Sequence, residues 1–397
     1  MGVTSMDTKE FNFRKANFPL IYQMILNISS NSVLESTQID ETCNKFYSIL
    51  NDVFLQTVPY KIKRKRRFSS WYTSNIIDNI LRKEKYRNNF KRYGNNLYLA
   101  RYKSLRKTIK NYIDSTYKNF IQTAENNIVQ NPSSFWSFIN EKKGISRIPG
   151  EMGDGERTYH KPTSIATAFA EYFSSVYDIS LNNNSCYVNH SDGHDAICIS
   201  SIARNQIIIA AKKLSNKLTS GPDEIPIFIV KDCIYVLSDP LTQIFNLIIS
   251  KATIPKIWRS AKIVSVLKKV DPSVVNNYRP TSILSNFSKL FEIVVYNAIY
   301  PVVRNSIKIE QHGFMLMKSC SSNLMLFSQY VSEVLDSTGQ VDVIYTDLQK
   351  AFDKVAHALL VQKLHNKFGF SDSLTNFFHS CLVDRRYSRL SSYLPLE

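Results

Sequence analysis

Hydrophobic and polar residues follow a helical spacing in one segment of this chain and a strand-like alternation in another. From residue 98 to residue 120 the apolar side chains recur every three or four positions, which predicts a long amphipathic helix; they are Tyr98, Tyr102, Leu105, Ile109, Tyr112 and Phe120. Between Val341 and Asp347 the side chains alternate instead, which predicts a short, largely buried strand that ends on an acid. Helical spacing returns from Lys354, with Asp353 placed to cap the helix, so the predicted order is strand, acidic turn and helix.

The patterning predicts four regions and an α+β fold. Residues 1–60 show weak periodicity, and residues 61–145 form a basic helical region. Residues 146–200 are predicted to be a linker, because glycines cluster near its start and a polar run follows from Asn182 to Ser191. Residues 201–397 mix helical and strand patterns, which predicts the α+β domain there.

Positive charge is concentrated in one segment. The formal net charge of the 397-residue chain is +17, and residues 61–120 hold 18 Lys and Arg against three acids, a local charge of +15. So few balancing acids favour contact with nucleic-acid phosphates over a merely solvated surface. The predicted contacts are Lys63, Arg64, Lys65, Arg66, Arg67, Arg101, Lys103, Arg106, Lys107 and Lys110. The tyrosines of the same helix are predicted to pack in its core rather than to stack on bases.

Cysteines and targeting signals bear on the compartment. The six cysteines are scattered, and neither a secretory signal nor an apolar run of about 18 residues is found. We therefore predict an intracellular protein without a membrane span, in the nucleus if Lys63–Arg67 acts as an import signal and otherwise in the cytoplasm. Cys186, His190, His194 and Cys198 could bind zinc, but the polar residues between them favour an ordinary loop.

Several sequence motifs occur in a fixed order. The segment from Asp347 to His357 is Asp-Leu-Gln-Lys-Ala-Phe-Asp-Lys-Val-Ala-His. Upstream of it lie Asn131-Pro-Ser-Ser-Phe-Trp-Ser-Phe138, Ser220-Gly-Pro-Asp-Glu-Ile-Pro226, Ile254-Pro-Lys-Ile-Trp258, Asn277-Tyr-Arg-Pro-Thr-Ser-Ile-Leu284 and Gln311-His-Gly-Phe314. Together they resemble the motifs of reverse transcriptases from non-LTR retrotransposons of the jockey-like kind. In that family the second of these upstream motifs has glycine where this chain has Glu224.

The resemblance implies an RNA-directed DNA polymerase. The implied fold is an N-terminal basic helical region followed by the fingers and the first part of the palm of a right-hand polymerase, in residues 201–397. Residues 1–60 would be the tail that follows an endonuclease, which is missing from this chain. The implied partners are an RNA template, a DNA primer or target and deoxynucleoside triphosphates, and the oligomeric state stays open.

The same resemblance implies roles for single residues. Asp347 would be catalytic and would bind Mg²⁺. Lys268 or Lys269 and Arg279 would grip the incoming triphosphate, with ordinary surface cations as the alternative. Phe352 would exclude a ribose 2′-hydroxyl, with a core aromatic as the alternative.

Polymerase chemistry needs more carboxylates than this chain offers. Two divalent ions must be held by several convergent carboxylates, and a single Asp binds Mg²⁺ weakly. The chain contains no Asp-Asp dipeptide and no Pro-Gln-Gly, which supply the remaining parts of the site in the resembled family. We therefore expect an incomplete and inactive polymerase. The alternative function is a non-catalytic nucleic-acid-binding protein derived from such an element.

Overall fold

The computed structural model divides the chain into two compact units. The first contains Tyr60–Ile148 together with Met1–Glu10 and Glu397, and the second contains Phe11–Pro59 and Pro149–Leu396. Most residues of the predicted N-terminal tail therefore lie in the second unit. The structure describes residues 9–27, 36–62, 68–69, 71–130, 135–136, 139, 148–155, 157–176, 196–268, 271–348 and 350–388.

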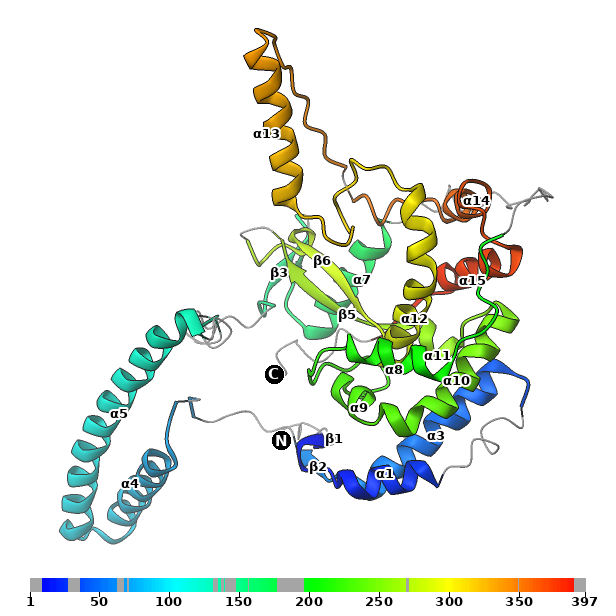
Figure 1. Cartoon of the computed structure of the whole chain (residues 1–397). Helices are drawn as coiled ribbons and strands as arrows, with labels where there is room; N and C mark the ends of the chain where they lie inside the picture. The colour runs from blue at the N-terminus through cyan, green and yellow to red at the C-terminus, as the bar shows by residue number, and fades with distance from the viewer. Residues whose placement is uncertain are drawn as a thin grey trace. The chain divides into compact units, whose positions relative to one another are not determined.

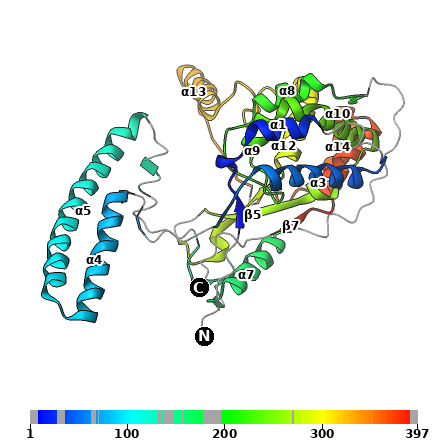
Figure 2. The same cartoon turned by 90° about the horizontal axis from the view of Figure 1, so that it is seen from below.

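Two long helices make up most of the described part of the first unit, and a short pair of strands belongs to it except for Phe11. Their bounds are α4 Ser74–Tyr93, α5 Asn96–Gln130, β1 Lys9–Phe11 and β2 Tyr60–Ile62. The chain turns between the helices at Gly94, whose φ of 65° suits a residue without a Cβ, and α5 returns alongside α4 (Figures 1 and 2). The helix predicted for residues 98–120 is confirmed, and α5 extends it at both ends.

A helical core dominates the second unit. Its helices up to residue 306 are η1 Phe13–Lys15, α1 Phe18–Leu26, α3 Ile39–Thr57, α7 Pro162–Ser174, α8 Arg204–Lys212, α9 Ile227–Asp232, α10 Ile234–Lys251, α11 Lys256–Arg259, η3 Val275–Asn277, α12 Asn286–Val303 and η4 Arg304–Ser306. Phe245, Trp258 and Phe291 form its centre, with the Phe245 and Phe291 ring centroids 4.8 Å apart. The N-terminal helix α3 packs against α1, α10 and α11, so it belongs to this core.

A small sheet lies beside the helical core (Figure 1). Its strands run in the order β6 (Tyr278–Ile283), β5 (Ser260–Leu267) and β7 (Arg386–Ser388). β5 pairs antiparallel with β6 and parallel with β7. A separate pair joins β3 (Met152–Gly153) to β4 (Thr158–Tyr159). The structure thus confirms the α+β prediction at the level of a helix-rich fold with few strands.

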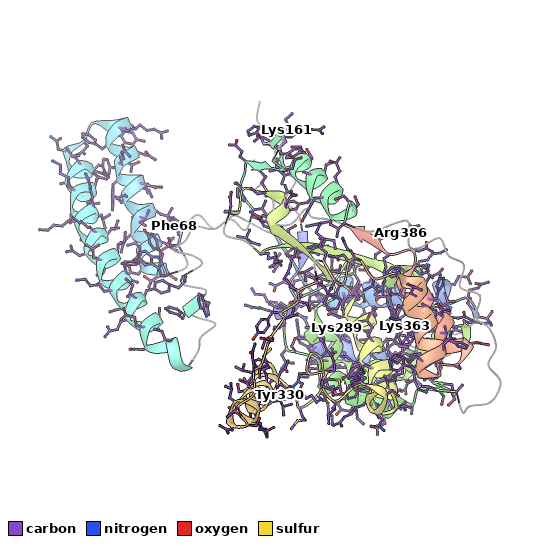
Figure 3. All side chains as sticks on the ribbon, turned by 90° about the horizontal axis from the view of Figure 1, so that it is seen from above. Phe68, Lys161, Lys289, Tyr330, Lys363 and Arg386 are labelled. Atoms are coloured by element: carbon purple, nitrogen blue, oxygen red, sulfur yellow. The ribbon has the colours of Figure 1, made fainter. Side chains whose placement is uncertain are left out.

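Three further helices follow α12 in the second unit: α13 Cys320–Asp336, α14 His357–Phe368 and α15 Asp372–Leu382. The structure describes every residue of α13, and none of them is buried; Tyr330, for example, is 59% exposed (Figure 3). α15 instead joins the core, where its Phe377 ring meets Phe291 at 5.7 Å between centroids. The loop segment at Ile197 crosses the α14–α15 turn, since its N–H donates to Gly369 and its carbonyl accepts from Ser371.

Two local predictions were wrong. Residues 341–347 form no strand, and Ile344 and Tyr345 in this segment are 89% and 84% exposed. Alternation favours a strand only where a neighbouring strand can complete the hydrogen bonds, and no strand in the described part of the chain pairs with this segment. Asp353 does not cap a helix, because α14 begins at His357 after Ala356 and the Asp353 N–H closes a turn onto the Lys350 carbonyl.

Other predictions fall wholly or partly outside the described residues. Lys269 and the run Lys63–Arg67 are among these, and of the four residues considered for zinc only Cys198, an exposed free cysteine, is described. Within the described chain, no helix is long and apolar enough to cross a bilayer.

Candidate nucleotide and nucleic-acid sites

The β5–β6 hairpin brings two of the predicted nucleotide-binding cations together. Val266 lies opposite Arg279, and the Lys268 N–H continues the ladder by donating to the Asn277 carbonyl at 2.8 Å. Residues two positions apart on a strand share a face, so Lys268 and Arg279 are diagonal neighbours on one face, roughly 7 Å apart between Cα atoms. Both side chains are exposed and can reach a ligand.

A buried polar cluster holds the Ser220–Pro226 turn against the end of this hairpin. The Ser285 hydroxyl donates to the Asp223 carboxylate at 2.6 Å, and the Tyr47 hydroxyl donates to it at 3.2 Å. The Tyr47 oxygen accepts the Trp258 indole N–H at 3.0 Å. Burial raises the pKa of Asp223, and the hydrogen bonds from Ser285 and Tyr47 oppose that rise. Burial also raises the pKa of Tyr47 well above its usual value.

The sequence did not predict the role of Tyr47. It lies on α3, and its partners Asp223 and Ser285 are 176 and 238 residues away along the chain. The one feature of the sequence that marks this part of α3 is the neighbouring aromatic residue Phe46. In the structure the Phe46 ring packs edge-on against Phe287, with 5.2 Å between centroids. Helix α3 is therefore a structural support of the turn and the hairpin.

Two positions in the Ser220–Pro226 turn have demanding backbone geometry. A Cβ on Gly221 would collide with the backbone at Leu284 and Ser285, so only glycine fits this close approach. Glu224 has a φ of 58°, in the left-handed region that side chains with a Cβ rarely adopt. This is the position at which the resembled family has glycine.

Asp347 lies on the exposed segment that precedes α14. The Lys350 ammonium, three residues on, lies 5.0 Å from the centre of the Tyr172 ring, and the Tyr172 hydroxyl donates to the Asn276 carbonyl at 3.3 Å. Because Asn276 leads directly into β6, these contacts tie the acidic turn to the hairpin that carries Arg279.

Phe352 projects into solvent. Its ring is 79% exposed and meets Phe314 edge-on, with 6.1 Å between centroids. The alternative of a core aromatic at this position is therefore wrong. Phe314 belongs to the Gln-His-Gly-Phe motif, so two of the motifs meet at this ring pair.

The fit of a divalent metal ion to Asp347 is poor. Among the residues that the structure describes, no group of three or more His, Cys, Asp or Glu side chains is placed to hold a metal ion. A two-ion site needs several carboxylates that converge on one point, and Asp347 brings one. The described residues do not form such a site.

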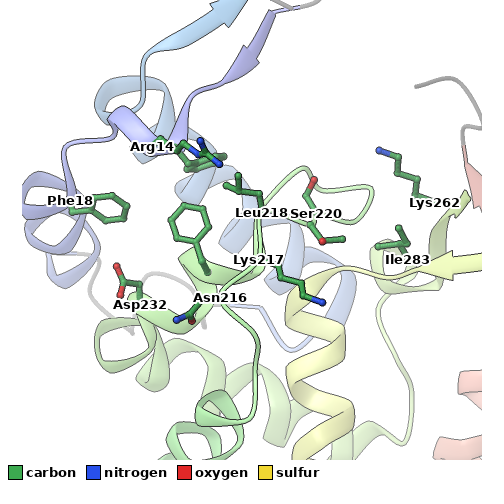
Figure 4. A pocket seen from close by; sticks show the side chains of 12 residues that line it. Arg14, Phe18, Asn216, Lys217, Leu218, Ser220, Asp232, Lys262 and Ile283 are labelled. Carbon is green, nitrogen blue, oxygen red and sulfur yellow. The ribbon is translucent and has the colours of Figure 1, made fainter. Parts of the chain in front are cut away.

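Cations also line a pocket next to the hairpin. The pocket has a volume of 830 Å³, and its charged lining is Arg14, Lys217, Lys262 and Asp232 (Figure 4). Lys262 lies opposite Ile283 and shares its face of β5 with residues 264, 266 and 268. Lys262, Lys268 and Arg279 thus share one face of the hairpin, with Val264 and Val266 between the two lysines. Cations near both ends of this face suit a negatively charged strand or nucleotide.

The α4–α5 hairpin carries the remaining predicted cations. Arg101, Lys103, Arg106, Lys107 and Lys110 are all exposed on α5, and within the described chain none of the five forms an ion pair. Four of them, with Ile109 and Ile113, line a shallow groove of 470 Å³. Unpaired cations on a solvent-facing helix are free to neutralise phosphates.

Residues 266–393 match the family model described as reverse transcriptase (RNA-dependent DNA polymerase). The chain carries a reverse transcriptase domain. The matched range includes the candidate residues Lys268, Arg279, Asp347 and Phe352.

The curated relatives identify the kind of reverse transcriptase. The chain is 26% identical over 248 residues to the RNA-directed DNA polymerase from mobile element jockey of Drosophila melanogaster. The aligned residues make up 60% of this chain and 25% of that protein. It is 28% identical to the probable RNA-directed DNA polymerase from transposon BS of the same species, over 48% of this chain and 21% of that protein. A third match, 31% identical over 37% of this chain, is the jockey enzyme of Drosophila funebris, of which it covers 16%.

The domain is thus homologous to the RNA-directed DNA polymerases of non-LTR retrotransposons and is jockey-like. The matched part spans at most a quarter of the length of these three relatives.

Proposed function

We propose that this chain serves RNA-directed DNA synthesis by a non-LTR retrotransposon, with residues 201–397 as fingers and partial palm. The observation that carries this proposal is the shared face of Lys268 and Arg279, tied through Tyr172 and Lys350 to the turn that follows Asp347. An RNA template, a DNA primer and deoxynucleoside triphosphates are the proposed partners.

Each residue of the proposed site has a chemical task that its side chain suits. Lys268 offers a point charge to the triphosphate, and Arg279 offers a planar fork for two phosphate oxygens. The exposed Phe352 ring is free to lie against the sugar and to exclude a 2′-hydroxyl. Asp347 would be one ligand of Mg²⁺, but its companion carboxylates are not among the described residues, so we assign no step of phosphoryl transfer.

A nucleotide-binding experiment tests the proposed contact of Arg279 with the triphosphate. We expect Arg279→Gln in the full chain to weaken binding of N-methylanthraniloyl-dATP in the presence of a primed RNA template by about 10-fold to 100-fold, because a charge-assisted pair is lost. Lys289→Gln, which changes an exposed lysine on α12 (Figure 3), is the matched control and should leave binding unchanged. Equal binding by the Arg279 variant and the unchanged chain would rule out this contact between Arg279 and the triphosphate.

Primer extension tests the chemistry. With Mg²⁺ or Mn²⁺ the 397-residue polypeptide should incorporate no deoxynucleotide above an Asp347→Ala control, because one carboxylate cannot organise two ions. Templated incorporation that the Asp347→Ala change abolishes would show that the chain completes its own site.

A second function is favoured by the α4–α5 hairpin. Its exposed cations support sequence-independent binding of nucleic acid, which needs none of the polymerase residues. This is the function that a non-catalytic derivative of the element would retain.

A further inference from the structure

Aromatic rings form a ladder at the tip of the α4–α5 hairpin. The Arg101 guanidinium carbon lies 5.7 Å from the centre of the Tyr86 ring. Tyr86 stacks on Tyr98 with 6.3 Å between centroids and 29° between planes, and Tyr98 meets Tyr93 at 6.4 Å and 43°. Tyr93 is the last residue of α4, directly before the Gly94 turn. The ladder therefore runs from a cation to the end of the hairpin.

The outer end of this ladder is open to solvent. Tyr93 is 63% exposed, although its ring contacts that of Tyr98 at a tilt, whereas Tyr86 and Tyr98 are half-buried. A different aromatic cluster packs the other end of the hairpin, where Trp71 meets Tyr117 at 5.1 Å and Phe120 at 6.3 Å, and those three rings are half-buried. Packing thus accounts for the Trp71 cluster but not for the exposed ring at the tip.

A polar groove leads along α4 to the same tip. It has a volume of 760 Å³ and is lined by Leu81, Glu84, Lys85, Asn88, Asn89, Lys91 and Arg92. Three of these residues are cations, and the two asparagines offer amide donors and acceptors of the kind that recognise base edges. Lys91 and Arg92 adjoin Tyr93 in the sequence, so charge and an open aromatic face occur together.

We propose that the hairpin tip binds unpaired nucleic acid, with one base stacked on the outer face of Tyr93 and the adjoining phosphates on Lys91 and Arg92. Stacking on aromatic rings is sequence-tolerant because every base has a π-face, but a base inside a duplex has both faces covered by its neighbours. The tip therefore selects single strands, RNA and DNA alike. This site deepens the proposed nucleic-acid-binding function and rests on it.

The test compares single strands with a duplex on the full chain. The probes are fluorescein-labelled oligouridylate and oligothymidylate dodecamers and a duplex of the same length, with binding measured by fluorescence anisotropy. We expect Tyr93→Ala to weaken both single strands by about 5-fold to 100-fold and to leave the duplex unchanged, because one stacked base is lost. Tyr93→Phe keeps the ring and should retain single-strand affinity within about twofold.

Two further variants separate stacking from charge. Tyr112→Ala removes a tyrosine that is 44% exposed on α5 outside the ladder, and it should leave all affinities unchanged. Changing Lys91 and Arg92 together to Gln should make the slope of log K against log salt on single strands shallower by about 1.4, whereas Tyr93→Ala should leave that slope unchanged. The helical circular dichroism of each variant should match that of the unchanged chain, since each change lies on the surface.

The outcomes distinguish this site from the function it rests on. If Tyr93→Ala leaves single-strand binding intact, or weakens single strand and duplex equally, the stacking site is wrong although the basic hairpin still binds. If the unchanged chain binds no probe at low salt, the proposed nucleic-acid-binding function fails together with it. If uridylate alone loses affinity, the site reads the 2′-hydroxyl rather than the base face, and the proposal is overturned.

Discussion

Glu224 occupies a backbone conformation that costs free energy for any residue with a Cβ. Its φ of 58° lies in the left-handed region, within the turn that the half-buried Asp223 carboxylate anchors to Ser285. Left-handed geometry costs roughly 1–2 kcal/mol for an L-residue, and glycine avoids this cost at the expense of a more flexible unfolded chain. The turn is thus held in place by contacts that exceed this strain.

Replacing Glu224 with glycine should stabilise the second unit. We expect the free energy of unfolding to rise by about 0.5–1 kcal/mol, measured by urea titration followed by near-ultraviolet circular dichroism. Gly221→Ala in the same turn is the opposite case: its Cβ would collide with the backbone at Leu284, and the free energy of unfolding should fall by about 1–3 kcal/mol. A Glu224→Gly variant no more stable than the parent would show that its side chain makes compensating interactions.

The nucleotide-binding role of Lys268 and Arg279 stays a prediction, although the structure shows how the two residues are placed. Lys268 and Arg279 lie 11 positions apart in the sequence, and the antiparallel register of β5 and β6 places them on one face. The contacts of Tyr47 could not be predicted, because no sequence pattern around α3 indicates that it packs against Asp223 or Ser285. Its contribution depends on packing between distant segments, which a single sequence does not record.

Among the elements of the chain, the α4–α5 hairpin carries many exposed cations on its two long helices. Neutralising five of its exposed cations, Arg101, Lys103, Arg106, Lys107 and Lys110, to Gln removes up to five phosphate contacts without touching the buried residues. If all five contact phosphates, the slope of log K against log salt should become shallower by roughly 3.5 on single strands and 4.5 on a duplex.

Nucleic-acid binding at graded salt concentrations by the full chain measures these slopes. The matched control neutralises Lys212, Lys213, Lys251, Lys256 and Lys289 of the second unit, which should change the slope less. Equal slopes for the two sets would assign the binding to net charge rather than to the hairpin.

Helices were more predictable than strands in this chain, for a physical reason. A helix closes its hydrogen bonds within one segment, so three- and four-residue spacing was enough to locate α5. A strand needs a partner: β7 pairs with β5, whose residues lie more than 100 positions earlier, and the alternating segment at 341–347 found none among the described strands. Alternation alone therefore predicted a strand where the structure has an exposed, extended segment.

At the scale of the whole molecule, the second unit joins distant parts of the chain around one core. α3 contributes Tyr47 and Phe46 from the N-terminal region, and α15 contributes Phe377 from the C-terminal region. The Ser380 hydroxyl on α15 accepts the Ile254 N–H at 3.1 Å, a bond buried between segments 126 residues apart. The segment 342–348, by contrast, is exposed at every position.

This contrast predicts unequal hydrogen exchange within one chain. Amides of α10, α12 and α15 open only when the shared core opens, so they should exchange slowly and with similar free energies of opening. No strand in the described part of the chain pairs with residues 342–348, so these residues should exchange within the shortest labelling time. Hydrogen exchange measured by mass spectrometry on the full chain resolves the slow helices and the fast segment. The amides of α13 should exchange at an intermediate rate, because α13 has no buried residue but its own helical hydrogen bonds protect it. Slow exchange at 342–348 in a monomer would mean that this segment is covered by another part of the chain. Protection that grows with protein concentration would instead show that a second copy covers it.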